Sequence, residues 1–167
     1  YDRAVRLCKN TKSRHDKKRD KSVELIFSKI DSQVEDDDKI IIVDATNDLD
    51  NSMTGAVASK VADKYKMPCI LLNRHNEKEI VVELDENGIE VEKEIDLSYF
   101  GGSARNSHNS PIEALKDVVG STESFDFAQG HQSAFGIKLP LDKIDDAKIE
   151  LNSILKDIEY DSFYTVD

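Results

Sequence analysis

The apolar residues follow two periodicities, and their order predicts strands that alternate with helices. Residues 39–44, KIIIVD, are typical of a buried strand, and residues 69–73, CILLN, form a second such run. Between them, residues 53–66 carry their apolar side chains on one helical face, and Pro68 follows. A strand, a helix and a strand in this order predict a parallel strand pair, as in α/β folds.

The second half of the chain continues with the same periodicities. Residues 80–84 and 89–95 alternate in polarity around the turn sequence DENG, which predicts a hairpin, and residues 133–140, SAFGIKLP, predict a further strand. Residues 111–119 and 141–158 have helical spacing, and Ser110 followed by Pro111 is typical of a helix start. The expected fold is a single α/β domain with a mixed sheet flanked by helices.

The first 36 residues differ from the rest of the chain. After the charged run RHDKKRDK, the apolar residues Val23, Ile26, Phe27 and Ile30 recur at helical spacing. We expect a basic connector helix within residues 1–36, which is either a solvated arm or a surface for a partner or phosphates, and an α/β domain over 37–167. Few of residues 1–13 are apolar, so weak anchoring is expected there. The charged helical pattern starts at once, which suggests a piece of a longer protein.

Composition and charge restrict the classes of function. The chain has 167 residues and a formal net charge of −11, which suits one soluble domain and disfavours high nonspecific affinity for long nucleic acid. The charge is uneven, with +6 over residues 1–30 and −17 over residues 31–167. No apolar run is long enough for a membrane span or a signal-peptide core, so we expect a cytoplasmic protein without a membrane partner.

Two groups of side chains invite a metal interpretation, and both fail on spacing. Cys8 and Cys69 lie far apart without a second ligand nearby, so Cys69 is expected to be a buried thiol. The loop with Asp44, Asp48 and Asp50 lacks the glycine and the glutamate that a calcium-binding loop requires. We interpret its carboxylates as helix caps and expect neither a metal ligand set nor a cofactor in this chain.

The run GGSARNSHNS at 101–110 is the first candidate site. It places Ser103, Arg105 and Ser107 as hydrogen-bond donors within five residues, in a loop that leads to a helix start. A guanidinium group binds phosphate oxygens in a bidentate manner, and a helix N-terminus favours anions. A phosphate-binding loop and an ordinary polar surface loop both fit this pattern.

The second candidate site is the stretch FDFAQGHQSAFGIKLP at 125–140. Gly130 and Gly136 allow unusual backbone angles and close approach of a ligand, and His131 between them adds a donor whose charge changes near neutral pH. The alternative is a turn before a core strand with a hydrogen-bonded His131. Since both candidate sites follow strands of an α/β sheet, we expect Arg105 and His131 to face one anion-binding cleft.

Taken in order, GGSARNS, PIEAL and FAQGHQSAFGIKLP resemble the C-terminal domain of DHH-family phosphoesterases, particularly RecJ-like single-strand-specific exonucleases. The segment KIIIVDATNDLDNSMTGAVASKVADKYKMPCILLN resembles the opening strand, helix and strand of that domain. RHDKKRDKSVELIFSKI is similar to the helix that connects it to the catalytic domain. The resemblance spans most of the chain.

The resemblance implies a substrate-binding role. It makes this chain the part that grips the phosphates of a single-stranded nucleic acid, and it assigns that role to the following residues: Ser103, Arg105, Ser107, Gly130, His131 and Gly136. Catalysis and two metal ions, manganese or magnesium, would belong to an N-terminal catalytic domain outside this chain. The isolated chain is therefore expected to be inactive.

Two departures from the family pattern keep alternatives open. Ala128, Gln129 and Gly130 replace the usual run of glycines before the histidine, and no DHH triplet occurs in the chain. One alternative keeps the family and changes the substrate to a short oligonucleotide or a cyclic dinucleotide, which suits the acidic charge. The other is a nonenzymatic module that binds a partner protein.

Overall fold

The computed structural model of the chain describes residues 17, 20–21 and 23–160. Its centre is a five-stranded mixed sheet with the strand order β1-β2-β5-β7-β6, in which β1 and β2 are parallel and all other neighbours are antiparallel. The strands of this sheet are β1 (Ile41–Asp44), β2 (Cys69–His75), β5 (Tyr99–Arg105), β6 (Phe127–His131) and β7 (Ala134–Pro140). The mixed α/β sheet expected from the sequence is confirmed.

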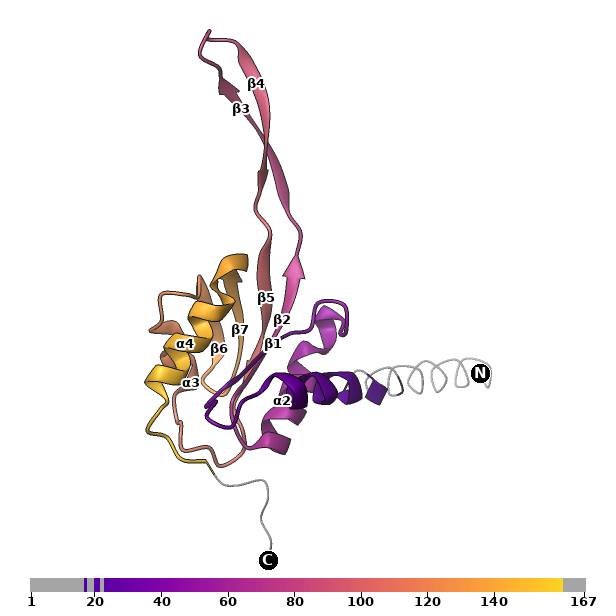
Figure 1. Ribbon diagram of the computed structural model, residues 1–167, viewed down its shortest axis with the longest axis vertical. Coiled ribbons are helices and arrows are strands. Elements are labelled where there is room, and N and C mark those ends of the chain that lie inside the picture. The colour runs from indigo at the N-terminus through magenta and orange to yellow at the C-terminus, as the bar shows by residue number, and fades with distance from the viewer. Residues whose placement is uncertain (1–16, 18–19, 22, 161–167) are drawn as a thin grey trace, which may run out of the picture.

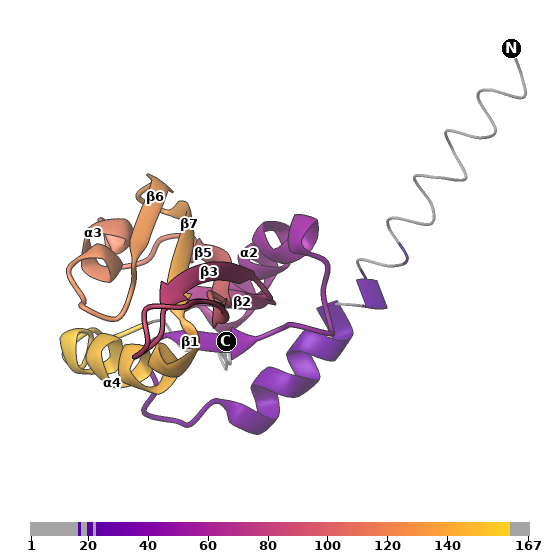
Figure 2. The ribbon, with the colours of Figure 1, turned by 90° about the horizontal axis from the view of Figure 1, so that it is seen from above.

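Helices cover both faces of this sheet (Figure 2). One face packs against α2 (Thr54–Tyr65), which follows a short 3-10 turn η1 (Asn51–Met53), and against the helical residues 23–33. The other face packs against α3 (Leu115–Gly120) and α4 (Ile144–Ile154), the latter preceded by the 3-10 turn η2 (Leu141–Lys143). The sheet is therefore the middle layer of three.

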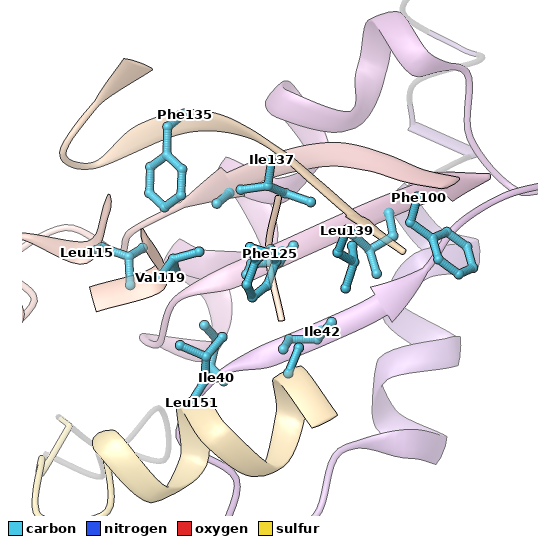
Figure 3. Packing of buried hydrophobic residues seen from close by; sticks show 14 of the residues in the cluster. Ile40, Ile42, Phe100, Leu115, Val119, Phe125, Phe135, Ile137, Leu139 and Leu151 are labelled. Carbon is cyan, nitrogen blue, oxygen red and sulfur yellow. The ribbon is translucent and has the colours of Figure 1, made fainter. Parts of the chain in front are cut away.

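Alternation along each strand divides the buried side chains into two cores. Ile40, Ile42, Phe135, Ile137 and Leu139 point toward α3 and α4, as Figure 3 shows. Toward α2 and residues 23–33 the sheet presents the following side chains: Ile41, Val43, Cys69 and Leu71. Burial of large aliphatic residues on both sides fixes which face each strand residue occupies, because a shift of one residue would exchange the two sets.

The N-terminal helix is part of the second core. Val23, Ile26 and Ile30 are buried against β1 and α2, so the apolar stripe expected from the sequence packs on the domain. The expectation for residues 1–13 falls outside the described residues. None of the helices in the described ranges is long and apolar enough to cross a membrane.

The predicted hairpin forms, and it projects far from the sheet (Figure 1). Strands β3 (Lys78–Leu84) and β4 (Glu90–Asp96) follow β2 and precede β5 in the chain, and they pair with each other in a separate two-stranded sheet. Ile80, Val82 and Leu84 lie in one exposed row, opposite Glu94, Glu92 and Glu90. Residues 77–96 contain nine carboxylates and two lysines, which makes this arm strongly acidic.

Three local predictions are wrong. Residues 101–105 are the last five residues of strand β5 and do not form a loop, because Phe100 and Ala104 are buried in the first core. Helix α3 begins at Leu115 and not near Ser110, whose hydroxyl instead accepts a hydrogen bond from the N–H of Ile112 (3.1 Å). The loop carboxylates were expected to cap the following helix, but the residue that precedes α2 is Met53, and neither Met53 nor Asp50, which precedes η1, makes a side-chain cap.

The acidic loop has other roles than capping. The carboxylate of Asp44 accepts a hydrogen bond from the N–H of Thr46 (3.0 Å), and Asp48 forms an ion pair with Lys29 (3.0 Å). The carboxylates thus shape the loop and bind the N-terminal helix to it.

Burial governs the chemistry of Cys69. The side chain lies fully inside the second core, and this burial raises the pKa of the thiol far above its ordinary value. In a Cys8→Ser variant, in which Cys69 is the single thiol, we expect no reaction with Ellman's reagent until denaturant unfolds the chain. Release of one equivalent of the thiolate product from the native variant would contradict this account.

The exposed arm makes little use of the cores, so its removal is expected to be tolerated. Replacing residues 77–97 with a short glycine-containing turn should change the free energy of unfolding by less than about 1 kcal/mol. Leu139→Ala, which empties a fully buried position, should cost about 2–5 kcal/mol in the same chain. Urea unfolding measures both, and an arm deletion as costly as the core substitution would refute the expectation.

Candidate functional site

The register of three strands brings the two candidate sequences together. Arg105 on β5 is paired with Ala134 on β7, which is in turn paired with His131 at the end of β6. Directly paired residues of an antiparallel sheet project to the same face, and these project to the face of α2. Arg105 and His131 therefore lie in one row across the sheet although 26 positions separate them.

This face is open where β7 and β6 continue beyond α2. Helix α2 packs mainly against β2 and β5. On β6, the side chains that share this face belong to Phe127, Gln129 and His131, and all three are exposed. Among the described residues no helix covers this part of the face, and we call it the shelf; it adjoins the start of α2.

Arg105 is half-buried in this shelf. Its Nη1 donates hydrogen bonds to the carbonyl oxygens of Ala104 (2.8 Å) and Phe135 (3.4 Å), and desolvation lowers the pKa of the guanidinium group. In the described part of the chain, no carboxylate lies within ion-pair distance of it. A cation that is partly withdrawn from water without a counter-charge is suited to receive an anion.

Ser103 and the start of α2 lie beside this guanidinium group. The hydroxyl groups of Ser103 and Thr54 are hydrogen-bonded at 2.8 Å. A Cβ on Gly55 would lie 2.4 Å from a terminal nitrogen of Arg105, so the absence of a side chain there lets the guanidinium group rest on the first turn of α2. The hydroxyls of Ser103 and Thr54, the guanidinium group of Arg105 and the N-terminus of α2 therefore lie next to one another.

Ser107 belongs to the same region. With Arg105, Ser133 and Ala134 it lines a hollow of about 400 Å³ beside α2. Asp63 also lines the hollow, and its Oδ1 lies 3.1 Å from Nδ1 of His108. Ser107 thus shares this hollow with Arg105, whereas Ser103, two residues before Arg105 on β5, lines a separate hollow.

The glycines of the second candidate sequence differ from each other. Gly130 has φ +138°, and a Cβ there would lie 2.9 Å from the carbonyl oxygen of Ala134, so the backbone requires glycine. Its own carbonyl accepts a hydrogen bond from Lys116 (2.9 Å). Gly136 is an ordinary strand residue next to Ser103, and its missing side chain leaves the shelf flat.

The first turn of α3 is not available to a ligand. The N–H of Lys116 donates to the carbonyl of Gln132 (3.2 Å), and the N–H of Asp117 donates to the side chain of the same residue (3.3 Å). The helix expected to attract anions after the first candidate sequence therefore holds the turn between β6 and β7. The helix start near the site is that of α2.

A smaller hollow of about 180 Å³ lies between Ser103 and the start of α2, and Asn73 lines it. Both amide hydrogens of this buried side chain are used, because Nδ2 donates to the carbonyl of Leu49 (3.1 Å) and to Oδ1 of Asn51 (2.6 Å). Among the described residues, nothing donates to Asn73 Oδ1. Such a group is rare in native proteins and marks a place for a water molecule or a ligand donor.

Sequence reasoning missed this asparagine and a neighbouring aromatic group. The ring of Tyr99 stacks on that of His75, with 5.0 Å between centroids, and Lys138 Nζ lies 4.3 Å from the centre of the Tyr99 ring. Tyr99 has the same parity along β5 as Ser103 and Arg105. Had β5 been recognised as a strand, that spacing would have placed all three on one face.

No group of histidine, cysteine or carboxylate residues in the described ranges has the geometry of a metal site. The manganese or magnesium ions that the resemblance implies are therefore not accommodated by the residues that the structure describes.

The chain is similar to known proteins over most of its length. No family model matches the chain. It is 27% identical over 158 residues, 95% of its length, to YorK, an inferred single-strand DNA-specific exonuclease of the SPbeta prophage of Bacillus subtilis (strain 168), and equally to YorK of Bacillus phage SPbeta. The chain spans only 24% of the length of these relatives.

Solved RecJ structures share the fold. RecJ from Thermus thermophilus in complex with Mg²⁺ superposes on 90% of the chain with a TM-score of 0.59 and 17% identity, covering 20% of RecJ. An exonuclease RecJ bound to manganese superposes on 89% with a TM-score of 0.56 and 16% identity, covering 31% of that protein. The resemblance to RecJ-like exonucleases expected from the sequence is confirmed, with this chain corresponding to a fraction of such a protein.

Gly102 provides a test of how closely the strands of the site approach. A Cβ there would lie 2.1 Å from the carbonyl oxygen of Leu71 on β2, whereas the nearest atom to a Cβ on Gly136 is 3.8 Å away. We expect Gly102→Ala to destabilise the fold by about 1–3 kcal/mol and Gly136→Ala to change stability by less than about 0.5 kcal/mol. Equal effects in chemical unfolding would show that the strand spacing is wrong.

Proposed function

We propose that this chain is the substrate-binding, C-terminal domain of a RecJ-like, metal-dependent exonuclease of the DHH family, and that it grips phosphates of single-stranded nucleic acid. The observation that carries the proposal is the row formed by Arg105 and His131. Arg105 has no carboxylate partner within the described residues. His131 lies on the same face of the sheet as Arg105 and is exposed. The similarity to YorK, whose name gives single-strand DNA as its substrate, supports single-stranded nucleic acid as the ligand.

The candidate residues divide into direct contacts and supports. Arg105 would bind two phosphate oxygens through its guanidinium group, and Ser103 and Ser107 would donate from their hydroxyls. His131 would add a ring N–H. Gly130 and Gly136 would act through the backbone, the first by shaping the end of β6 and the second by leaving the surface open.

Hydrolysis would require parts that lie outside this chain. The chain corresponds to about a quarter of the relatives to which it is similar, and the two divalent metal ions would belong to the rest of the protein. Residues 1–36 would connect the domain, 37–167, to that catalytic part. The packing of Val23, Ile26 and Ile30 supports this arrangement, because it fixes the described end of the connector on the domain.

The acidic arm favours a short substrate as the second candidate. Strands β3 and β4 emerge at the Tyr99 end of the shelf and carry most of the nine carboxylates between residues 77 and 96. Their negative charge would repel a strand that continued past this end. A short oligonucleotide or a cyclic dinucleotide would avoid this repulsion.

Substitution of Arg105 tests the proposal. We expect Arg105→Ala to weaken binding of a phosphorylated single-stranded oligonucleotide by about 1.5–3 kcal/mol, the range for a charged hydrogen bond, and to change the melting temperature little. Arg74→Ala is the matched control, because Arg74 is exposed and its Nε bonds to Asn76 (3.0 Å). Fluorescence anisotropy at one fixed salt concentration measures both. Unchanged affinity in Arg105→Ala would end the phosphate-binding proposal.

His131 gives an independent test of the same surface. Since its side chain is exposed, we expect His131→Ala to change the free energy of unfolding by less than about 0.5 kcal/mol and to weaken oligonucleotide binding by about 0.5–1.5 kcal/mol. A variant that loses stability while binding as well as the wild type would assign His131 a structural role.

A further inference from the structure

The open shelf continues along β7 beyond the proposed phosphate site. Further along this strand, Lys138 is paired with Phe127 on one side and Gly101 on the other. This row lies four residues from the row of Arg105, Ala134 and His131, or about 13 Å along the strand. Both rows project to the same face of the sheet.

Phe127 is a partly exposed aromatic residue on this face. Its side chain is 41% exposed, whereas the next residue, Ala128, packs on the first core from the opposite face. Single exposed apolar residues are common, but among the exposed large hydrophobic residues of the described ranges Phe127 is the aromatic one. An accessible aromatic ring on the edge strand of an open sheet face suits stacking of a planar group.

Lys138, the β7 partner of Phe127, supplies a positive charge on the same face of the sheet. Its Nζ lies over the ring of Tyr99, and no carboxylate of the described residues forms an ion pair with it. The ring of Tyr99 in turn stacks on that of His75 on β2, the other neighbour of β5, and His75 lies over Gly101. This packing restrains the lysine on the shelf, so less entropy is lost when it binds an anion.

From these observations we propose that Phe127 and Lys138 form a nucleobase-stacking site, in which a base stacks on Phe127 and an adjacent phosphate binds Lys138. The inference rests on the proposed function, because the nucleic acid whose base stacks on Phe127 would bind Arg105 through its terminal phosphate. A separation of about 13 Å corresponds to about four nucleotides at the stacked spacing of about 3.4 Å, and to fewer in an extended strand. The acidic arm beyond Tyr99 then limits the site to a few nucleotides.

An abasic scan tests the inference from the side of the ligand. The probes are eight-nucleotide deoxythymidine strands with a phosphate at the 5′ or the 3′ end and one abasic residue at each position in turn. With the wild-type 167-residue chain, we expect one or two positions within the first four or so from the phosphorylated end to weaken binding about 5-fold or more, because base–aromatic stacking contributes about 1–3 kcal/mol. A flat scan would overturn the inference.

Variants test it from the side of the protein. Phe127→Ala should weaken binding of the intact strand about 5-fold or more and should abolish the position dependence of the abasic scan. Lys138→Gln should lower the slope of log Kd against log salt by about 1. Ile149→Ala, at an exposed apolar position on α4, is the control and should bind as the wild type does.

The outcomes separate this inference from the function on which it rests. If Arg105→Ala weakens binding while Phe127→Ala and the abasic scan have no effect, the phosphate site stands and the stacking site is refuted. If Arg105→Ala binds as well as the wild type, the proposed function itself fails. Melting curves of each variant establish that the change in affinity does not come from unfolding.

Discussion

The register of β5 against its two neighbours is the constraint on which the rest of the molecule depends. Phe100 and Ala104 must face the core beneath α3 and α4, and this requirement turns Tyr99, Ser103 and Arg105 to the other side. Gly102 fits against the backbone of β2, where a side chain would collide with the carbonyl of Leu71. A shift of one residue in the register would bury Arg105 and expose Phe100. The same register therefore determines both the packing of the core and the position of the site.

The charge distribution gives the domain a polarity. A chain with a net charge of −11 has little general attraction for nucleic acid, and the acidic arm concentrates part of that charge at one end of the sheet. Against this background, Arg105 and Lys138 are cations on an open shelf without carboxylate partners in the described ranges. A binding surface of this kind favours a few well-positioned contacts over a long electrostatic track.

Support for the site comes from residues that themselves touch no proposed ligand. Gly55 lets the guanidinium group of Arg105 lie on α2, Lys116 and the first turn of α3 hold the end of β6, and His75 stacks behind Tyr99. The unpartnered oxygen of Asn73 is the one buried polar atom of the described side chains that this network leaves unsatisfied. Rigid elements therefore position the shelf, which is what precise binding of a charged group requires.

The sequence by itself determined the alternation of strands and helices, the hairpin and the grouping of Ser103, Arg105 and Ser107, because these follow from local periodicity and spacing. It also determined the resemblance to RecJ-like exonucleases. It did not reveal that residues 101–105 are a strand, since two glycines with serine and arginine are typical of a loop, and burial of Ala104 outweighs that preference. The sequence led us to expect Arg105 and His131 on one surface, but only the tertiary structure decided that strand pairing sets them in one row and that Tyr99, Phe127 and Lys138 lie on the same face. Pairing between distant strands fixes those positions, and the local sequence carries no record of which strands pair.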